Sequence, residues 1–592
     1  MRRSWIIGCL LVAVGAIPGW GQSGEWKQLF NGHDLTGWQH VGPGGMTVED
    51  GLIRTHGGMG LLWWTGGKVG DCVIRVVYRM HDKNDNSGEV SMAGIASRPK
   101  RAWLRDEGKR LTAFVCPTTN ASRRRSQDSL YWKLEQLTAL RRSLGAPSPL
   151  INFEHHLCHA ASAFYPSPFD RALVLTLYQC GDMWSGLLAL GEAGNLSILH
   201  PLRFPNSLGW FYSRVTELLG FRPGRDEHKV QWLSKDGAPE FVPVFRRLFY
   251  KDSKGLPTLD LQQFVKGQGG RSVFSPETLN ELCISDATPL RGSAHGAQIA
   301  RSAQDFLEET VIDLAETYRH KTGAANLCVA GGIFLNVMLV HALERRTGFD
   351  RIFVQPVSGN PGTALGAAYL AANRLQGSIA RHPLSHVYLG PQFRESEIKA
   401  VFDNCKAIYR YLPSEKQLVD ETVQLLQDDK IVAWCQGRME FGHRALGNRS
   451  ILASAFSPYV MENLNKYIKH REDFHPFALS VPADTSSEFF ECSDNCRFMC
   501  SIGILKEAPQ GLERFTFNGR SVRVHTVEKS VNPRFWTLLR RFGELAPAPV
   551  LVNTSFNLFG EPLVCDPREA IRSFYCSGID ALVMGNFLVV KP

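Results

Sequence analysis

The stretch NLCVAGGIFLN, residues 326–336, decides the fold class of much of the chain. Its apolar start is typical of a buried strand that ends at the glycine pair, and VMLVHALERRT (337–347) continues as a helix. The same order of strand, glycine-rich turn and small-residue helix returns in RIFVQPVSGNPGTALGAAYLAAN, residues 351–373. Two such units in succession predict an α/β region.

Two further segments extend this region towards the N-terminus. ALVLTLYQ (172–179) is expected to form a buried strand, and DFLEETVIDLAETYRHK (305–321) a strongly periodic helix. The α/β region therefore covers residues 151 to about 375. Its glycine turns would let backbone amides approach a phosphate, and the helix after each turn favours an anion. The candidate nucleotide-binding residues here are Gly331, Gly332, Asn336 and Gly362.

Three histidines lie within five residues at the start of HHLCHAASAFYPSPFD, residues 155–170. If this stretch is helical, His155 and His159 lie one turn apart on the same face. Two imidazoles placed in this way can share one metal ion. Two half-buried histidines on an amphipathic helix are the alternative, and for a bare HxxxH pattern that alternative is the commoner one.

A second α/β region follows a linker at 376–390 and covers residues 391–592. Three stretches combine cations with glycine, hydroxyl or amide residues: GRMEFGHRALGNRSILA (437–453), KHREDFHPFALSV (469–481) and VLVNTSFNLFGEPLV (550–564). Their charged donors suit phosphate, carboxylate or carbamoyl oxygens, with surface salt bridges as the alternative. The candidate catalytic residues are Arg438, Arg444, Arg449, Lys469 and Arg471, and Asn553 and Ser555 are candidate cofactor-binding residues.

Length and composition limit the broad class of protein. A chain of 592 residues suggests three or four domains. A net charge of +9 over this length suits small anionic substrates and is weak evidence for nucleic acid, so no nucleic-acid partner is expected. The 14 cysteines include no CxxC pair, which gives no indication of a zinc ribbon or a redox pair and suits a reducing cytosol.

The N-terminal segment points to a different compartment. Residues 1–23 have two arginines, an apolar stretch and then small residues, the pattern of a secretory signal peptide. No later segment is long and apolar enough to predict a stable membrane span. Residues 24–90 have short strands broken by NG, DG and GG turns, and residues 91–150 are basic and mostly helical in pattern.

Part of the N-terminal segment resembles a known family. LFNGHDLTGW (29–38), VEDGLIRT (48–55) and NDNSGEV (84–90) resemble the front of the secreted 3-keto-glycoside hydrolase domain, a lectin-like β-sandwich. The resemblance covers only the opening strands and ends just after Gly88. It implies a partial β-sandwich at 24–90, which has too few strands to close a core of its own.

The larger resemblance spans residues 91 to 592. Seven colinear motifs are similar to those of the O-carbamoyltransferases of nodulation-factor, cephalosporin and aminoglycoside biosynthesis: HHLCHAASAFYPSPFD, SLGWFYSRVTELLGFRPGRDEHKV, CVAGGIFLN, NPGTALGAAYLAA, GRMEFGHRALGNRSILA, KHREDFHPFA and NTSFNLFGEPLV. This resemblance implies an actin/Hsp70-like ATPase domain at 91–375, truncated at its start, and a YrdC-like domain at 391–592. It implies ATP and carbamoyl phosphate as substrates and a divalent metal, usually iron.

The resemblance also implies a metal site, with departures. His155 and His159 match the family's metal-binding histidines. Tyr178 and Asn360 stand where the family has aspartates, so the predicted ligand set is His155, His159, Tyr178 and Asn360 with reduced negative charge. Further departures from the family motifs are His443, His475 and Leu479.

The sequence therefore predicts an enzyme that activates carbamoyl phosphate with ATP to carbamoyl-adenylate and passes the carbamoyl group to a hydroxyl of a small-molecule or sugar acceptor. Two alternatives are a degenerate, non-catalytic homologue and an exported carbohydrate-binding or glycoside-hydrolase-like protein. The catalytic form is expected in the cytoplasm, where ATP and carbamoyl phosphate are found, and this conflicts with the signal-like segment.

Overall fold

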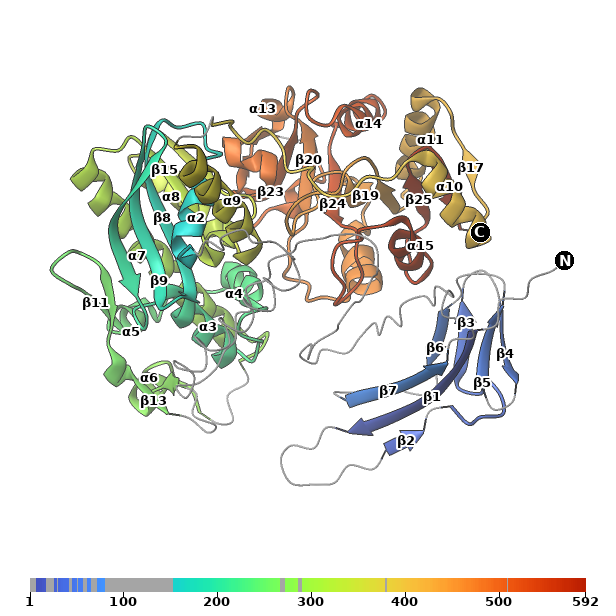
Figure 1. Cartoon of the computed structure of the whole chain (residues 1–592), viewed down its shortest axis with the longest axis horizontal. Coiled ribbons are helices and arrows are strands. Elements are labelled where there is room, and N and C mark those ends of the chain that lie inside the picture. Colours follow the sequence, from blue (N-terminus) through green and yellow to red (C-terminus); the bar gives the residue numbers. More distant parts are fainter. Residues whose placement is uncertain are drawn as a thin grey trace.

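The structure is a computed structural model that describes residues 7–16, 26–28, 30–41, 45–49, 52–56, 61–64, 72–79, 153–266, 272–285, 290–377, 381–507 and 509–591. The predicted helical stretch at 91–150 and the NDNSGEV motif lie outside these residues. The described chain forms a small β part, drawn in blue in Figure 1, and two α/β parts, drawn in cyan to yellow and in gold to red.

The first α/β part is built on a five-stranded sheet in the order β10-β9-β8-β15-β16. Strands β8, β9 and β10 are antiparallel, and β15 runs parallel to both β8 and β16. The predicted strand ALVLTLYQ is confirmed, since it lies within β8. The bounds are β8 (Arg171–Gly181), β9 (Trp184–Glu192), β10 (Asn195–Arg203), β15 (Asn326–Ala330) and β16 (Arg351–Val354).

Helices cover both faces of this sheet because β8 is apolar on both sides. Leu173 and Leu175 pack in one core with residues of α7, whereas Val174 packs in another with α2. The helices are α2 (His155–Phe164), α3 (Leu208–Leu218), α4 (Glu227–Leu233), α5 (Val242–Arg246), α6 (Pro276–Glu281), α7 (Ala294–Thr322), α8 (Val337–Arg346) and α9 (Asn360–Gln376). Two small hairpins pair β11 (Phe249–Lys251) with β12 (Pro257–Leu259) and β13 (Phe264–Lys266) with β14 (Ser272–Phe274).

A close contact between α2 and α9 positions the histidines. A Cβ atom at Gly366 of α9 would lie 1.7 Å from the Cys158 carbonyl oxygen of α2, so only glycine allows the two backbones to come this close. This contact holds α2, which carries the histidines, against the helix that begins at Asn360.

The second α/β part contains a ten-stranded mixed sheet in the order β17-β26-β25-β18-β19-β24-β20-β23-β22-β21. Only the pairs β18–β25 and β20–β23 are parallel. The strands are β17 (Arg410–Tyr411), β18 (Val432–Cys435), β19 (Arg449–Ser454), β20 (Ala478–Pro482), β21 (Phe490–Glu491), β22 (Gly503–Leu505), β23 (Ser521–Val527), β24 (Leu551–Ser555), β25 (Ala581–Met584) and β26 (Phe587–Val590).

Two hydrophobic cores cover the two faces of this sheet. One contains residues of α10 and α15, and the other contains residues of α11 and α14. The helices are α10 (Glu395–Asn404), α11 (Glu415–Gln427), α12 (Val460–Glu462), α13 (Ser486–Phe489), α14 (Pro533–Gly543) and α15 (Pro567–Tyr575), with a π-helical segment at Asn463–Lys469.

The two α/β parts pack against each other. Asn495 satisfies the open edge of β16: its side-chain amide donates to the Ile352 carbonyl at 2.8 Å, and its oxygen accepts from the Val354 N–H at 3.1 Å. The neighbouring Phe498 and Met499 belong to the hydrophobic core of the first α/β part. Residues 381–394, which connect the two parts, contain no helix or strand.

The N-terminal β part differs from its prediction in where it begins. Residues 7–16, within the segment predicted to be a signal peptide, form strand β1, which pairs with β7 over eight residue pairs. The apolar sequence IGCLLVAVGA suits a strand paired along its length with CVIRVVYR. The strands are β1 (Ile7–Ala16), β2 (Trp26–Gln28), β3 (Trp38–Val41), β4 (Gly45–Glu49), β5 (Leu52–His56), β6 (Leu61–Trp64) and β7 (Cys72–Arg79). Removal of residues 1–23 as a signal peptide stays a prediction.

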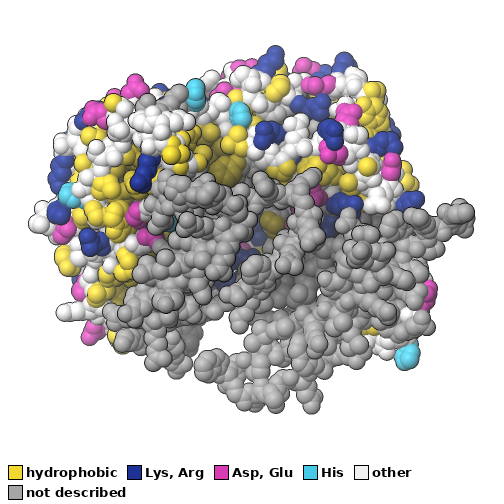
Figure 2. All heavy atoms as spheres, in the orientation of Figure 1, with side chains coloured by type: hydrophobic (Ala, Val, Ile, Leu, Met, Phe, Trp, Pro, Cys, Tyr) yellow, Lys and Arg dark blue, Asp and Glu magenta, His cyan; other side chains and the backbone are white. Residues whose placement is uncertain are grey.

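The described surface carries charges of both signs. On the face shown in Figure 2, basic and acidic side chains of the described residues are interspersed rather than gathered in a stripe of one sign. Among the helices that the structure describes, none combines the length and the apolar composition that crossing a membrane requires.

Candidate functional site

The first candidate site, here called the histidine cluster, consists of His155, His159, Tyr178 and Asn360. Helix α2 begins at His155, and the Glu154 side chain caps it by accepting from the Leu157 N–H at 2.7 Å. The Nε2 atoms of His155 and His159 lie 3.1 Å apart, as expected for residues one helical turn apart. Both imidazoles are buried.

The other two predicted ligands complete the cluster. Tyr178 lies on β8 and Asn360 begins α9, and the Asn360 amide donates to the Tyr178 hydroxyl at 3.1 Å. The Tyr178 ring centroid is 5.7 Å from that of His155 and 5.9 Å from that of His159. A Cβ at Gly332 would lie 2.8 Å from the Tyr178 ring, so glycine is needed for this packing. The structure therefore brings all four predicted metal ligands together.

The donor set fits a divalent metal in number but not in charge. Two ligands at about 2.1 Å from one tetrahedral metal are about 3.4 Å apart, close to the observed His155–His159 separation. Burial, followed by the nearby His155 and His156, lowers the pKa of His159 well below its ordinary value, so its ring is neutral, as metal binding requires. The Asn360 Oδ1 atom is buried without a partner among the described residues.

Carboxylates are what this cluster lacks. Among the described residues, no three His, Cys, Asp or Glu side chains gather where they could hold a metal. An iron or zinc ion here would have two neutral nitrogens, an amide oxygen and a phenol as donors, and metal binding stays a prediction.

In the glycine turns of the first α/β part, backbone amides already have hydrogen-bond partners within the protein. Gly331 has φ of +99°, and a Cβ there would lie 2.1 Å from the Leu177 carbonyl oxygen. Its N–H donates to the Ser358 carbonyl at 2.8 Å, and the Gly362 N–H donates to Gly359 at 3.0 Å. Asn336 caps α8 by accepting from the Leu339 N–H at 3.1 Å. Nucleotide binding by these residues and Gly332 stays a prediction, and a nucleotide would have to use other donors than these two amides.

The second candidate site lies on the ten-stranded sheet, and we call it the cationic face. Asn553 of β24, Ala478 of β20 and Arg523 of β23 lie directly opposite one another on adjacent strands. Residues paired in this way point to the same face of the sheet. Since strands are about 4.8 Å apart, Asn553 and Arg523 are separated by about 10 Å with only the small Ala478 side chain between them. Asn553 and Ala478 are both buried, at 2% and 3% exposed.

Lys469 bounds the cationic face at the end of β24. Its Nζ donates to the Asn557 Oδ1 at 2.9 Å, to the Asn557 carbonyl at 3.0 Å and to the Ser555 hydroxyl at 3.3 Å. Burial, followed by the charge of Arg471, lowers the Lys469 pKa well below its ordinary value. The structure therefore brings the candidate site residues Lys469 and Ser555 into contact, and their role in binding stays a prediction.

Three arginines meet beside this face with little compensating charge. Burial, followed by repulsion from Arg444 and Arg471, lowers the pKa of Arg523 to about 9. Burial lowers that of Arg471 to about 10. The Nε atoms of Arg444 and Arg523 and the Nη2 atom of Arg471 have no hydrogen-bond partner among the described residues. Other nitrogens of these groups do have partners, since Arg471 Nε donates to the Asn465 Oδ1 atom at 2.8 Å. Mutually repelling cations with unpaired nitrogens are the environment that a bound anion would neutralise.

Residues of both α/β parts enclose this cluster. The Arg523 guanidinium lies 5.5 Å from the Trp232 ring centroid, and Arg444 donates to the Leu335 carbonyl at 3.2 Å. Lys229 forms an ion pair of 2.8 Å with Glu472. The cationic face therefore lies where the two parts meet.

Two of the five predicted catalytic cations lie elsewhere. Arg449 is 2% exposed, and its guanidinium donates to the Gln436 carbonyl at 2.7 Å and the Asn448 carbonyl at 3.0 Å. Arg438 donates to the carbonyls of Leu389 at 2.6 Å and Gly390 at 3.0 Å. Both arginines line a different cavity of about 510 Å³. In this structure they hold the connecting segment and the 437–449 loop in place.

Sequence reasoning missed two important residues. Arg523 lies in the strand SVRVHTV, where a single arginine between valines is the only signal. Glu440 is 2% exposed and accepts from the N–H groups of Leu446 at 2.7 Å and Asn448 at 2.9 Å, so it shapes the loop that carries Arg444.

Comparison with protein-family models matches both α/β parts. The model described as "Carbamoyltransferase N-terminus" matches residues 93–369, and "Carbamoyltransferase C-terminus" matches residues 423–591. The model described as "3-keto-alpha-glucoside-1,2-lyase-like domain" matches residues 25–103.

Similar whole proteins extend these matches. An uncharacterised protein of Synechocystis sp. is 34% identical over 78% of this chain and 81% of its own length. Nodulation protein NolO of Bradyrhizobium diazoefficiens is 33% identical over 74% of this chain and 78% of its own length. The chain is thus a two-part α/β protein of the transferase class, with a hydrolase-like β domain at its front. It belongs to the carbamoyltransferase family.

The similarity to solved structures is weak. The crystal structure of full-length HypF in the phosphate- and nucleotide-bound form aligns with a TM-score of 0.28 and 15% identity over 42% of each chain. A likeness this weak carries no argument, so the actin/Hsp70-like and YrdC-like assignments stay predictions.

Proposed function

We propose that the protein is an ATP-dependent O-carbamoyltransferase whose cationic face binds carbamoyl phosphate. The observation that carries this proposal is the group of buried, mutually repelling arginines with unpaired nitrogens, in a chain of the carbamoyltransferase family. The phosphate of carbamoyl phosphate supplies the negative charge that Arg444, Arg471 and Arg523 lack. Charge-assisted hydrogen bonds of this kind are about twice as strong as neutral ones.

The proposed reaction has three steps. Water displaces the phosphate of carbamoyl phosphate, which gives carbamate and inorganic phosphate. A carbamate oxygen then attacks the α-phosphorus of ATP, forming carbamoyl-adenylate and releasing pyrophosphate. Finally the acceptor hydroxyl attacks the carbamoyl carbon, AMP leaves, and the hydroxyl proton is released, so that an O-carbamoyl product is formed.

The residues of the cationic face have separate tasks in this scheme. Arg471 and Arg523 hold the phosphate, while Lys469 and Ser555 bound the site at the end of β24. Enclosure between the two α/β parts keeps bulk water away from the adenylate, which water would hydrolyse. The order β10-β9-β8-β15-β16, with β9 antiparallel to its neighbours, supports an actin-like first part that receives the adenylate.

In this proposal His155, His159, Tyr178 and Asn360 would hold a divalent metal, most suitably iron. A metal ion bound there would supply polarisation of the carbamoyl carbonyl or charge for the adenylate phosphate. The acceptor is a hydroxyl-bearing small molecule or sugar, and the catalytic form works in the cytoplasm, where both ATP and carbamoyl phosphate are found.

Exchange of labelled pyrophosphate into ATP tests this function. We expect exchange that requires carbamoyl phosphate, because carbamoyl-adenylate must form before pyrophosphate can return to ATP. Exchange that is absent with purified, folded full-length protein would favour a non-catalytic homologue. That alternative is supported by the Tyr178–Asn360 hydrogen bond, which joins two side chains at positions where the family has aspartates.

The hydrolase-like β domain supports a further alternative, an exported carbohydrate-binding protein. Retention of the full-length chain on immobilised oligosaccharide, without nucleotide, would favour it.

A further inference from the structure

A buried chain of three polar side chains crosses the sheet next to the cationic face. The Asn553 Nδ2 atom donates to the Ser480 hydroxyl oxygen at 3.0 Å, and the same oxygen lies 3.0 Å from Nδ1 of His525. All three side chains are at most 2% exposed. Sequence and family motifs give no reason for this chain, since Ser480 and His525 lie outside the candidate site residues.

One atom of the Asn553–Ser480–His525 series has no hydrogen-bond partner in the described part of the protein. The Oδ1 atom of Asn553 is buried and accepts no hydrogen bond from any residue that the structure describes. Leaving a buried carbonyl oxygen unpaired costs about 1–3 kcal/mol, so such atoms need an explanation. Asn553 faces the same side of the sheet as Ala478 and Arg523, and Arg523 is one of the three clustered arginines.

The protonation state of His525 sets the orientation of the Asn553 side-chain amide. Burial lowers the pKa of His525 to about 3, so the ring is neutral and one of its nitrogens is an acceptor. When Nδ1 accepts from the Ser480 O–H, the Ser480 oxygen is left to accept from Asn553 Nδ2, and Oδ1 is turned away from Ser480. The proton of His525 then lies on Nε2.

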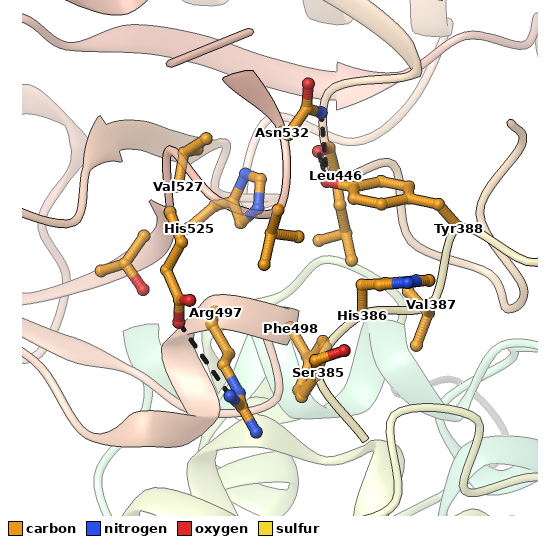
Figure 3. A pocket seen from close by; sticks show the side chains of 13 residues that line it. Ser385, His386, Val387, Tyr388, Leu446, Arg497, Phe498, His525, Val527 and Asn532 are labelled. Atoms are coloured by element: carbon orange, nitrogen blue, oxygen red, sulfur yellow. Dashed lines mark hydrogen bonds and ion pairs between the residues drawn. The ribbon is translucent and has the colours of Figure 1, made fainter. Parts of the chain in front are cut away.

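The surroundings of His525 suit this arrangement. Its ring stacks on Phe535, with centroids 6.2 Å apart and planes inclined by 21°, and this fixes its orientation. It also lines the small cavity of about 20 Å³ shown in Figure 3, which is large enough for one water molecule.

We propose that Asn553 determines substrate specificity by accepting a hydrogen bond from the amino group of the carbamoyl moiety, with Ser480 and His525 as positioning residues. This inference rests on the proposed binding of carbamoyl phosphate at the cationic face. The amino group is the neutral N–H donor that distinguishes carbamoyl phosphate from acetyl phosphate, which carries a methyl group in its place. A site with a buried acceptor discriminates against the analogue that leaves the acceptor unpaired.

Calorimetric titration of the full-length protein with carbamoyl phosphate, acetyl phosphate and inorganic phosphate tests the proposal. We expect the wild type to prefer carbamoyl over acetyl phosphate by about tenfold or more. Asn553→Leu should reduce this ratio towards one and leave the affinity for inorganic phosphate unchanged. Thr554→Val is the matched control, because Thr554 is the next residue of β24 and faces the opposite side of the sheet.

The possible outcomes separate this inference from the proposed function. Equal affinity of the wild type for the two acyl phosphates, or a ratio that survives Asn553→Leu, would overturn the specificity role while the anion site stands. A wild type that binds none of the three anions would overturn both.

The positioning role has an independent readout. With ¹⁵N-labelled histidine, and His525→Phe to assign the signal, nuclear magnetic resonance should show His525 protonated at Nε2 and not at Nδ1. His525→Phe should also lower the carbamoyl-to-acetyl ratio, because Ser480 loses the acceptor that orients it. Protonation at Nδ1 would point the Asn553 Nδ2 group into the site and would overturn the proposal.

Discussion

The histidine cluster and the cationic face differ in how their polar groups are satisfied. In the histidine cluster His155 lies against His159 and Asn360 donates to Tyr178, so the side chains are in mutual contact and neutral in character, although Asn360 Oδ1 has no partner among the described residues. In the cationic face Arg444, Arg471 and Arg523 repel one another and leave nitrogens unpaired. The cationic face therefore has positive charge that an anionic ligand would neutralise. The histidine cluster lacks the carboxylates that would attract a metal cation.

Substituting the arginines of the cationic face should have a large effect on anion binding. Arg471→Ala should lower the affinity for carbamoyl phosphate by about one to two decades, because a charge-assisted hydrogen bond contributes roughly 1.5–3 kcal/mol. Arg523→Ala should have an effect of the same size. The measurement is calorimetric titration with carbamoyl phosphate.

Arg541→Ala serves as the control, because Arg541 pairs with Asp420 at 2.7 Å on the surface of α14. Unchanged affinity in a folded Arg471→Ala variant would remove Arg471 from the site.

Substitutions in the histidine cluster should change its affinity for a metal ion. Asn360→Asp restores one negative charge, so it should tighten binding of iron or zinc by about tenfold, as one unit of charge near a metal warrants. His159→Ala should abolish binding because it removes one of the two nitrogens. Metal content by mass spectrometry after dialysis compares the wild type with both variants.

Two results would count against this account of the cluster. Stoichiometric, tightly held metal in the wild type would show that the missing carboxylates do not matter. Equal and negligible metal in all three proteins, with nucleotide present, would favour the non-catalytic homologue.

A further expected effect, outside the two sites' ligands, is on stability at low pH. Burial, and for His475 the neighbouring Arg471 next, lowers the pKa of both His475 and His525 from 6.5 to about 3. The unfolded chain therefore binds more protons between these values, so stability is complete above pH 6.5 and falls as the pH falls towards 3. The loss should be about 1.4 kcal/mol per pH unit for each histidine.

Urea unfolding between pH 7 and pH 4 measures this slope. His525→Phe should reduce it by about one proton, since phenylalanine does not titrate. A slope that His525→Phe leaves unchanged would show that His525 is not buried in its neutral form.

Much of the local structure could be predicted from the sequence. The strand at 172–179 and the helices at 305–321 and 337–347 have unbroken apolar periodicity, and the structure confirms them. The pairing of β1 with β7 could not be predicted, because a signal peptide and an apolar strand share the same composition. The order of the ten-stranded sheet depends on pairings between distant segments, which local patterns do not encode.

The candidate sites were predictable to different degrees. The four residues of the histidine cluster were found because family motifs mark them, although they lie up to 205 positions apart along the chain, from His155 to Asn360. Arg438 and Arg449 share charge and motif with Lys469, but in the structure their guanidinium groups donate to backbone carbonyls of the connecting segment and of the 437–449 loop. Arg523 was missed because one arginine on a strand has no periodicity to reveal it.

The central claim is that carbamoyl-adenylate forms at the cationic face and does not require the histidine cluster. The most direct test is carbamoyl-phosphate-dependent ATP–pyrophosphate exchange in the wild type, Arg471→Ala and His159→Ala, with circular dichroism to show that each protein is folded. The account predicts exchange in the wild type and in His159→Ala, and a loss of about one to two decades in Arg471→Ala at subsaturating carbamoyl phosphate. Exchange that His159→Ala abolishes and Arg471→Ala retains would contradict it.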